Sequence, residues 1–379
     1  MRLPSQRRRV SPQPSYRPEV LERMETTPPE TGVEDTQNHA FDPHIDHDYA
    51  LRPGPAVVDP MVKENSSLRK ENCQLRLQIE TFSLRQQFCV HRFADSDKDI
   101  RFFTRFASYD SLMCFWGSLQ ESQKVQRESI STLEPIDEFF LLLNFFALGS
   151  KERDLADWYG IHHHTVSKVI RSWSNYLFTI LGSVRIWIPE KEIRRNLPAE
   201  FQLYPDTTVI LDCTELRFQC PSSPLLQSEV FSSYKSHCTL KGLIGIAPHG
   251  PVTFVSALFA GSASDKQITR ESGVLKMLKP AMAVMVDKGF LIDDIVPCKV
   301  YRPAFLSHRP QMSAGEVRET PTISRLRVHM ERSIRRIKEH KIFDSVIPLS
   351  VLGNINQLFA VACLLTNYEN GPLGNPGDV

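Results

Sequence analysis

Apolar and polar positions follow different patterns in successive parts of the chain. Residues 1–60 are rich in proline and charge and have almost no apolar periodicity. Such a segment cannot bury enough surface to offset the entropy lost on ordering. We therefore predict a disordered tail over 1–60, a coiled-coil helix over 61–90, a helical domain over 95–200, an α/β domain over 201–370 and a second disordered tail over 371–379.

Apolar and asparagine side chains recur at alternating spacings of four and three at the start of the second segment. These positions are Met61, Asn65, Leu68, Asn72, Leu75, Ile79 and Phe82. Leucine at d and asparagine at a are typical of a short parallel two-stranded coiled coil, which would make the protein a homodimer. An amphipathic helix that packs on its own protein gives the same pattern, and the sequence leaves both interpretations open.

Helical periodicity continues from residue 95 to 200, and its last part has the rhythm of a helix-turn-helix. Apolar positions on two short helices flank Gly160, which suits the tight corner between them. In such a unit the second helix enters the major groove. Its predicted DNA contacts are His163, Thr165, Ser167, Lys168 and Arg171. The adjacent histidines 162–164 do not indicate a metal site, because neighbouring side chains on a helix diverge.

Short β-branched or apolar runs begin near residue 205. They cover Val209–Cys213, Thr239–Ala247, Val252–Phe259 and Ala281–Val286. A helix is predicted over 265–278 before the last run, and one long helix with a basic face over 323–342. Strands followed by alternating helix and strand predict an α/β layer fold.

Charge and cysteine usage narrow the class of protein. The formal net charge is only +1, so any attraction to nucleic acid must come from local patches. Arg7 to Arg9 form one such patch, either a nuclear address or a solubilising tail. The apolar run Phe139–Leu148 falls short of the about 20 residues of a membrane-spanning helix, so we expect no membrane segment. The eight cysteines lack zinc-binding spacing, and we expect reduced thiols.

Three acids are placed where they can meet. Asp212 and Asp287 each follow an apolar run, and we expect each to end a strand, with Gly289 allowing a sharp turn beside the second. Glu331 lies in the basic segment RLRVHMERSIRRIK. Because hard oxygen ligands suit Mg²⁺ or Mn²⁺, two such ions could activate a nucleophile for in-line attack on a phosphodiester. Taken singly, each acid is better explained as a turn residue or surface ion pair, and only the order of strand, strand and basic helix favours a shared site.

These segments together resemble a known family. VILDCTE, FSSYKSHCTLKGLIGIAPHG, GSASDKQITRESG, VMVDKGF and RVHMERSIRRIK are similar to the DDE endonuclease domain of Harbinger-type and related transposase-derived proteins. The resemblance runs from about residue 95 to 370. It implies an RNase H-like fold, a mixed sheet flanked by helices, preceded by the helix-turn-helix domain.

The resemblance also implies a set of functional residues. Asp212, Asp287 and Glu331 would be the catalytic metal ligands for two divalent ions, with Asp265 as a supporting acid behind them. The predicted backbone contacts to DNA are Lys288, Arg325, Arg327, Arg332, Arg335, Arg336 and Lys338.

The sequence departs from the family in its first part. Residues 1–60 contain no cysteine, so the family's frequent N-terminal zinc finger is missing. Phe145 and Phe146 stand where an arginine-containing stretch is expected, and histidines occupy the helix-turn-helix corner. We therefore expect that recognition of a specific terminal repeat is either lost or supplied by a separate DNA-recognition protein.

We predict a nuclear, metal-dependent DNA endonuclease or strand transferase. The main alternative is a domesticated, catalytically inactive DNA-binding or scaffold protein that retains the fold. A hydrolase with Cys213 or Cys220 as nucleophile lacks a convincing histidine nearby in sequence.

Overall fold

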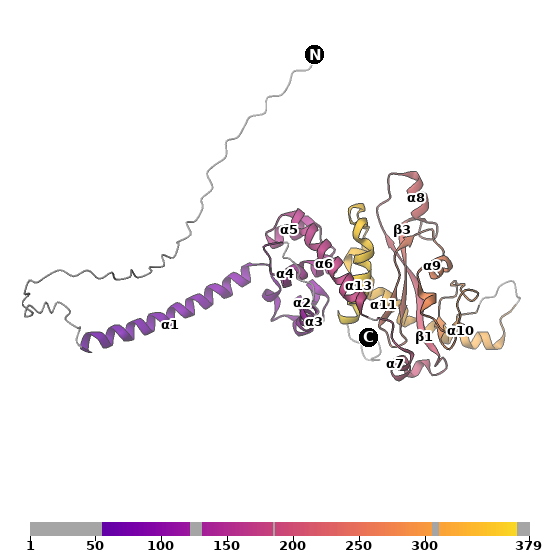
Figure 1. Ribbon diagram of the computed structural model, residues 1–379, viewed down its shortest axis with the longest axis horizontal. Coiled ribbons are helices and arrows are strands. Elements are labelled where there is room, and N and C mark those ends of the chain that lie inside the picture. The colour runs from indigo at the N-terminus through magenta and orange to yellow at the C-terminus, as the bar shows by residue number, and fades with distance from the viewer. Residues whose placement is uncertain (1–54, 122–130, 185, 305–310, 370–379) are drawn as a thin grey trace, which may run out of the picture. The chain divides into compact units, whose positions relative to one another are not determined.

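A computed structural model describes residues 55–121, 131–184, 186–304 and 311–369 of the chain (Figure 1). By its internal contacts the chain divides into residues 1–69 and 70–379. Helix α1 (Pro55–Gln86) runs through the boundary. The predicted tails lie outside the described residues except for 55–60, where the prediction of disorder is wrong because α1 already begins at Pro55.

The heptad side chains of α1 are exposed to solvent. Met61 is 63% exposed, Leu68 57%, Leu75 49% and Ile79 65%. Asn72 accepts a hydrogen bond from Arg76 Nε, one turn along the same helix, at 2.9 Å. The described part of α1 therefore shows a helix with an uncovered apolar seam.

A helical segment follows, built around one buried helix. Its elements are η1 (Val90–Phe93), α2 (Asp97–Thr104), α3 (Tyr109–Glu121), α4 (Pro135–Leu148), α5 (Glu152–Tyr159), α6 (His163–Ser183), α7 (Glu190–Arg195) and η2 (Ala199–Phe201). Because α4 is apolar on all sides, the other helices surround it, and residues 136–147 are all buried. The acids in α4 have partners: Asp137 accepts from the Val90 amide at 2.9 Å and Glu138 from Trp173 Nε1 at 3.1 Å.

The sheet that follows has seven strands, both parallel and antiparallel. They are β1 (Thr207–Arg217), β2 (Phe231–Ser232), β3 (His237–Ile246), β4 (Val252–Val255), β5 (Phe259–Ala260), β6 (Ala283–Met285) and β7 (Lys299–Tyr301). The main order is β2-β3-β1-β6-β7, and β4 and β5 also pair with β3. β1 is antiparallel to β3 and parallel to β6.

Helices cover both faces of the sheet, so the chain has a mixed α/β fold. They are α8 (Pro224–Val230), α9 (Asp265–Glu271), η3 (Val274–Lys276), α10 (Ala314–Leu326), α11 (Val328–Lys338), α12 (Lys341–Asp344), η4 (Leu349–Asn354) and α13 (Ile355–Glu369). Val209 and Leu211 of β1 point into the apolar cluster that includes Ile268 of α9, whereas Ile210 points into the larger cluster with Met330 and Ile337 of α11. The period-two alternation of β1 thus assigns its side chains to two cores.

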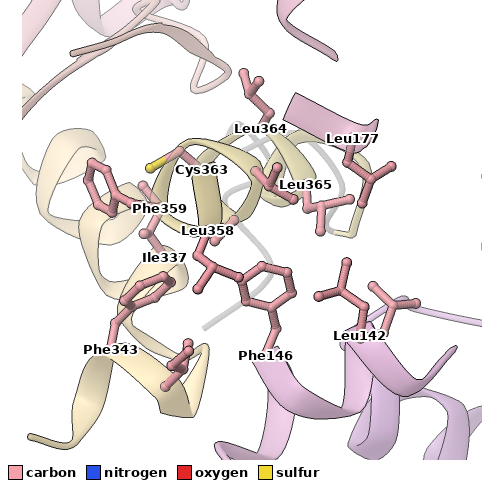
Figure 2. Close-up of a cluster of buried hydrophobic side chains, with 14 of the residues drawn as sticks. Leu142, Phe146, Leu177, Ile337, Phe343, Leu358, Phe359, Cys363, Leu364 and Leu365 are labelled. Atoms are coloured by element: carbon pink, nitrogen blue, oxygen red, sulfur yellow. The ribbon is translucent and has the colours of Figure 1, made fainter. Parts of the chain in front are cut away.

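Helix α13 joins the helical segment to the sheet. It packs on α6, α11 and β4, and Figure 2 shows Leu358 and Leu365 among side chains from α4 and α6. A Cβ at Gly242 of β3 would lie 2.7 Å from Phe359 Cε1, so this glycine permits the close approach of α13. Within the described residues, Leu349–Glu369 is the one segment long and apolar enough to cross a membrane, and 56% of it is buried inside the protein.

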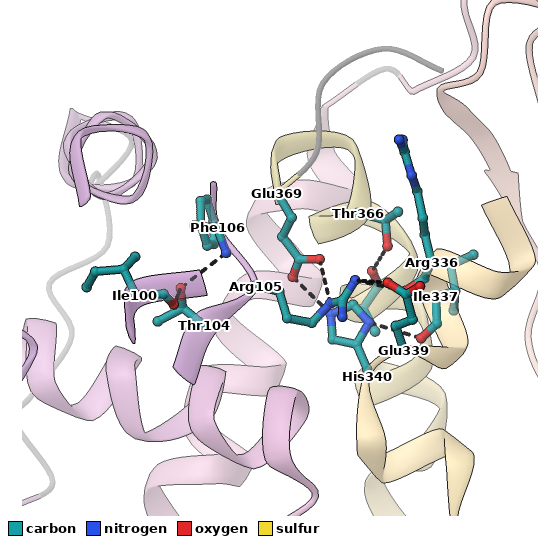
Figure 3. Close-up of polar contacts among 11 residues, drawn as sticks. Ile100, Thr104, Arg105, Phe106, Arg336, Ile337, Glu339, His340, Thr366 and Glu369 are labelled. Atoms are coloured by element: carbon teal, nitrogen blue, oxygen red, sulfur yellow. Dashed lines mark hydrogen bonds and ion pairs between the residues drawn. The ribbon is translucent and has the colours of Figure 1, made fainter. Parts of the chain in front are cut away.

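A buried polar cluster ties the same elements together (Figure 3). Glu369 at the end of α13 accepts from His340 Nε2 at 2.9 Å and from Arg105 Nε at 3.3 Å. Arg105, which follows α2 with a left-handed φ of 71°, also donates to Glu339 Oε2 at 2.9 Å. His340 and Glu369 are almost completely buried. The cluster therefore links the helical segment to α13 and to the residues between α11 and α12.

The strand predictions are confirmed for β1, β3 and β6, and three details of the predicted elements are wrong. The 252–259 run forms two strands, β4 and β5, that pair with different parts of β3. The helix predicted over 265–278 is interrupted after α9. The long helix predicted over 323–342 is broken at Arg327 and again after Lys338, and it gives parts of α10, α11 and α12.

Candidate active site

Strand register brings two aspartates to one place. Ile210 of β1 is paired with Met285 of the parallel strand β6, and Asp212 and Asp287 each lie two residues further on. Equal offsets from a parallel pair place both side chains at the same level and, by the period of two, on the same face. The prediction that Asp212 ends its strand is wrong. β1 continues to Arg217, because its residues up to Arg217 pair with β3. Asp287 does follow the end of β6.

Helix α11 covers this face and brings an arginine to the two aspartates. Arg327, at the junction of α10 and α11, donates from Nη1 to Asp287 Oδ1 at 2.5 Å and from Nη2 to Asp212 Oδ2 at 3.4 Å. The second oxygen of Asp212 accepts from the Cys213 amide at 2.8 Å. Arg327 is buried, unlike Asp287, whose side chain is half exposed. The guanidinium thus bridges the two carboxylates.

Glu331 lies one helical turn after Arg327, in the first turn of α11. It lines the same cavity of about 860 Å³ as Asp212 and Asp287. The three predicted acids therefore face one space, drawn from two strands and one helix. Within the described ranges, however, no three His, Cys, Asp or Glu side chains converge closely enough to hold a metal ion.

Burial changes the ionisation of the site. It raises the pKa of Asp212 to about 6, against the opposing effect of the Arg327 charge and the Cys213 amide. Burial also raises the pKa of the Cys213 thiol, and the charge of Asp265 adds to this. A thiol that stays protonated is a poor nucleophile, which weighs against the cysteine hydrolase alternative.

Asp265, predicted as a supporting acid, lies across the cavity at the start of α9. It forms an ion pair with Lys241 Nζ at 2.7 Å, and it lines the cavity together with Asp212 and Cys213. Lys241 was missed by sequence reasoning. A lysine within the apolar run of β3 was the signal that could have found it, since such a charge requires a buried partner.

The predicted DNA-contacting cations of this region are distributed unevenly. Arg335 and Lys338 line the cavity, where the unpredicted Lys235 joins them. Burial lowers the pKa of Lys338, and the Lys235 charge adds to the effect. Lys288, Arg325 and Arg332 are exposed and Arg336 is partly exposed. Arg327 is the exception, because it faces the acids rather than solvent.

The predicted helix-turn-helix region is a helix pair joined at Gly160, whose φ is 62°. Lys168 and Arg171 are exposed on α6 in a stripe with His164, Asn175 and Phe178. The remaining predicted contacts differ in exposure: His163 is exposed, and Thr165 and Ser167 are partly exposed. Ser167 Oγ donates to Glu152 of α5. The pair thus presents a basic stripe of residues, while Ser167 is occupied within the protein.

The donor atoms of the three acids are of the type that a hard divalent cation binds. Asp212, Asp287 and Glu331 offer only oxygen donors, the ligands that Mg²⁺ and Mn²⁺ prefer. In the described conformation, the oxygens of the two aspartates that face each other are bonded to Arg327 instead.

Comparison with known families bears on the same segment. Residues 211–367 match the DDE superfamily endonuclease family. The resemblance inferred from the motifs is thereby confirmed for the segment from β1 to α13, at the level of the superfamily. The DDE segment includes all three acids, Lys241, Asp265 and the basic residues of α11. No curated protein matches the chain.

Proposed function

We propose that this protein is a transposase-derived DNA endonuclease or strand transferase with an RNase H-like DDE domain, in which Asp212, Asp287 and Glu331 hold divalent metal. One observation carries the proposal: two aspartates at equal offsets in parallel strands and a glutamate from α11 line one cavity within a segment that matches DDE superfamily endonucleases. Two Mg²⁺ or Mn²⁺ ions would supply an activated oxygen nucleophile and stabilise the leaving oxygen.

The residues of the chain itself would bind and orient the DNA strand. Lys235, Arg335 and Lys338 line the same cavity as the aspartates. Cations there neutralise backbone phosphates as a strand enters, and release of counterions makes such binding sensitive to salt. Arg325, Arg332, Arg336 and Lys288 would extend the contact outside the cavity, and Arg327 would contact phosphate when it leaves the acids. Asp265 would hold Lys241 in place beside them.

A nicking assay tests the catalytic part of the proposal. Supercoiled plasmid is incubated with wild-type protein, Asp287→Asn and Asp294→Asn in Mg²⁺ or Mn²⁺. Asp294 is the matched control because it is an acid of the same segment that pairs with Lys266, outside the cavity. We expect nicking by the wild type and Asp294→Asn, and a loss of at least a hundredfold in Asp287→Asn.

The inactive-scaffold alternative predicts a different result from the same assay. Its supporting observation is that Arg327 already bridges the two aspartates, so the acids are paired in the absence of metal. Intact plasmid with all three proteins, together with unchanged DNA binding, would establish the scaffold alternative.

We propose that the exposed seam of α1 pairs with a second copy of the chain. Leu68 and Leu75 lie at d positions of the heptad, and Leu77 is equally exposed but lies off the seam. In sedimentation experiments, the double variant Leu68→Ala/Leu75→Ala should shift the protein from dimer to monomer, whereas Leu77→Ala should not. An unchanged profile for the double variant would show that this seam does not hold a dimer together.

Nuclear localisation and a separate DNA-recognition partner complete the proposal. The arginines at positions 7–9 support the first expectation. The lack of cysteine in residues 1–60 supports the second. Replacing Arg7, Arg8 and Arg9 with alanine in a fluorescent fusion should reduce nuclear accumulation, and unchanged accumulation would contradict that role.

A further inference from the structure

Arg327 occupies the position in which a cation would bind the two aspartates. Its Nη1 and Nη2 contact one oxygen of Asp287 and one of Asp212. The other oxygen of Asp212 is already bonded to the Cys213 amide. The Asp212 oxygen without this amide bond is therefore the one that the guanidinium holds, so a metal ion that bridges the aspartates must share Asp212 with Arg327 or displace it.

The bridge compensates a repulsion that the fold creates. Register places two carboxylates on the same face of the sheet, and α11 covers that face. Two negative charges at one partly buried place are unfavourable unless a cation neutralises them. The planar guanidinium matches this need because its two terminal nitrogens can bond two carboxylates at once.

The bridge is also incomplete and can be released locally. Arg327 Nε is buried without a hydrogen-bond partner among the described residues, so the guanidinium is not fully satisfied where it lies. Arg327 is the junction between α10 and α11, and its backbone amide bonds to Ile323. Its side chain can leave the acids by rotation while both helices keep their hydrogen bonds.

We propose that Arg327 is an internal counter-cation that competes with divalent metal for Asp212 and Asp287. In the metal-free protein it stabilises the paired aspartates. Metal binding displaces the guanidinium from at least one of the aspartates. The metal affinity of the wild type is therefore lowered by the cost of breaking that contact. This inference rests on the proposed function, because it assumes that the two aspartates are metal ligands.

The test measures Mn²⁺ binding directly, from the electron paramagnetic resonance signal of free Mn²⁺, with the full chain and no DNA. The variants are Arg327→Gln, Arg327→Lys and the matched control Arg318→Gln, an exposed arginine of α10 outside the cavity. We expect Arg327→Gln to bind Mn²⁺ roughly tenfold more tightly than the wild type, because a charge-assisted hydrogen bond of this kind is worth at least that factor. Arg327→Lys should lie between them, since an ammonium group is a point charge that spans two carboxylates less well. Arg318→Gln should match the wild type.

Thermal unfolding without metal gives a second readout. Arg327→Gln should have a lower Tm than the wild type in chelator and should regain more of it on addition of Mn²⁺, whereas Arg318→Gln should change neither value. If Arg327→Gln does not fold, Arg327→Lys carries the same comparison.

The outcomes separate this inference from the proposed function. Unchanged or weaker Mn²⁺ binding in the Arg327 variants, with the wild type binding and Asp287→Asn not, overturns the competition and leaves the metal site intact. Absence of Mn²⁺ binding in the wild type and in every Arg327 variant overturns both the metal site and the competition. Binding by Arg327→Gln that the wild type lacks supports the competition in its strongest form.

Discussion

The replacement of Glu369 by glutamine tests how strongly the buried polar cluster joins the helical segment to the C-terminal helices. Glu369 contacts His340 and Arg105, and its side chain is 1% exposed. Both ring nitrogens of His340 face acceptors, Nδ1 the Ile337 carbonyl at 3.0 Å and Nε2 the carboxylate at 2.9 Å. Glu369 is therefore tied to one buried side chain of the C-terminal helices and to one cation of the helical segment.

The magnitude follows from burial. Glu369→Gln keeps the shape but removes the negative charge that faces His340 and Arg105, and breaking a buried pair in this way costs about 3–5 kcal/mol of unfolding free energy. Glu339→Gln is the matched control: Glu339 pairs with the same guanidinium at 2.9 Å, but it is 42% exposed. Its loss should cost at most about 1 kcal/mol.

Chemical denaturation followed by circular dichroism measures both values under the same conditions. Equal losses in the two variants, or a loss below about 1 kcal/mol for Glu369→Gln, would refute the reasoning that burial makes this cluster a structural link. A further sign of the link is the probe dependence of unfolding. Tryptophan fluorescence reports on Trp116 and Trp173 in the helical segment. In Glu369→Gln it should give a lower unfolding midpoint than the circular dichroism signal of the sheet.

Three other predictions follow from the site and the helix pair. Burial raises the pKa of Asp212 from 3.8 to about 6, so between these pH values the folded metal-free protein holds a proton that the unfolded chain releases. The unfolding free energy of the wild type, relative to that of Asp212→Asn, should therefore fall by up to about 3 kcal/mol as pH rises from about 4 to about 6. Denaturation curves that show a constant difference between the two proteins across this range would contradict the shift. Maleimide should label the exposed Cys220 rapidly at pH 7 and Cys213 slowly, because burial raises the pKa of the Cys213 thiol; peptide mapping that finds equal labelling would show an accessible thiolate. The double variant Lys168→Ala/Arg171→Ala should weaken DNA binding and reduce its salt dependence by up to about two counterions. Replacement of Lys191, an exposed lysine on α7, by alanine should change neither. Fluorescence anisotropy over a salt series measures affinity and salt dependence, and an unchanged slope for the double variant would remove α6 from the DNA-binding surface.

The sequence was informative where local patterns decide the structure. β-branched or apolar runs located β1, β3 and β6, and α4 lies within the segment 95–200 in which helices were predicted. The acids could be selected because a carboxylate next to an apolar run needs a partner.

What the sequence could not supply depends on long-range pairing. Nothing local distinguishes a strand that ends at Asp212 from one that continues to Arg217, because the continuation depends on pairing with β3. The equal offsets of Asp212 and Asp287 are a property of register between strands that are distant in sequence. Arg327 looked like one more residue of a basic helix face, and its contacts to both aspartates appear only when the strands and α11 are brought together.

The position of α13 has a consequence for biosynthesis. This helix supplies Leu358 and Phe359 to the core and Glu369 to the polar cluster, and it contacts both the helical segment and the sheet. A nascent chain that has passed residue 354 still lacks all of these contacts, so its apolar surfaces stay uncovered until α13 emerges from the ribosome. Chains terminated before this helix should therefore be substrates for chaperones and proteases rather than shorter, partly active enzymes.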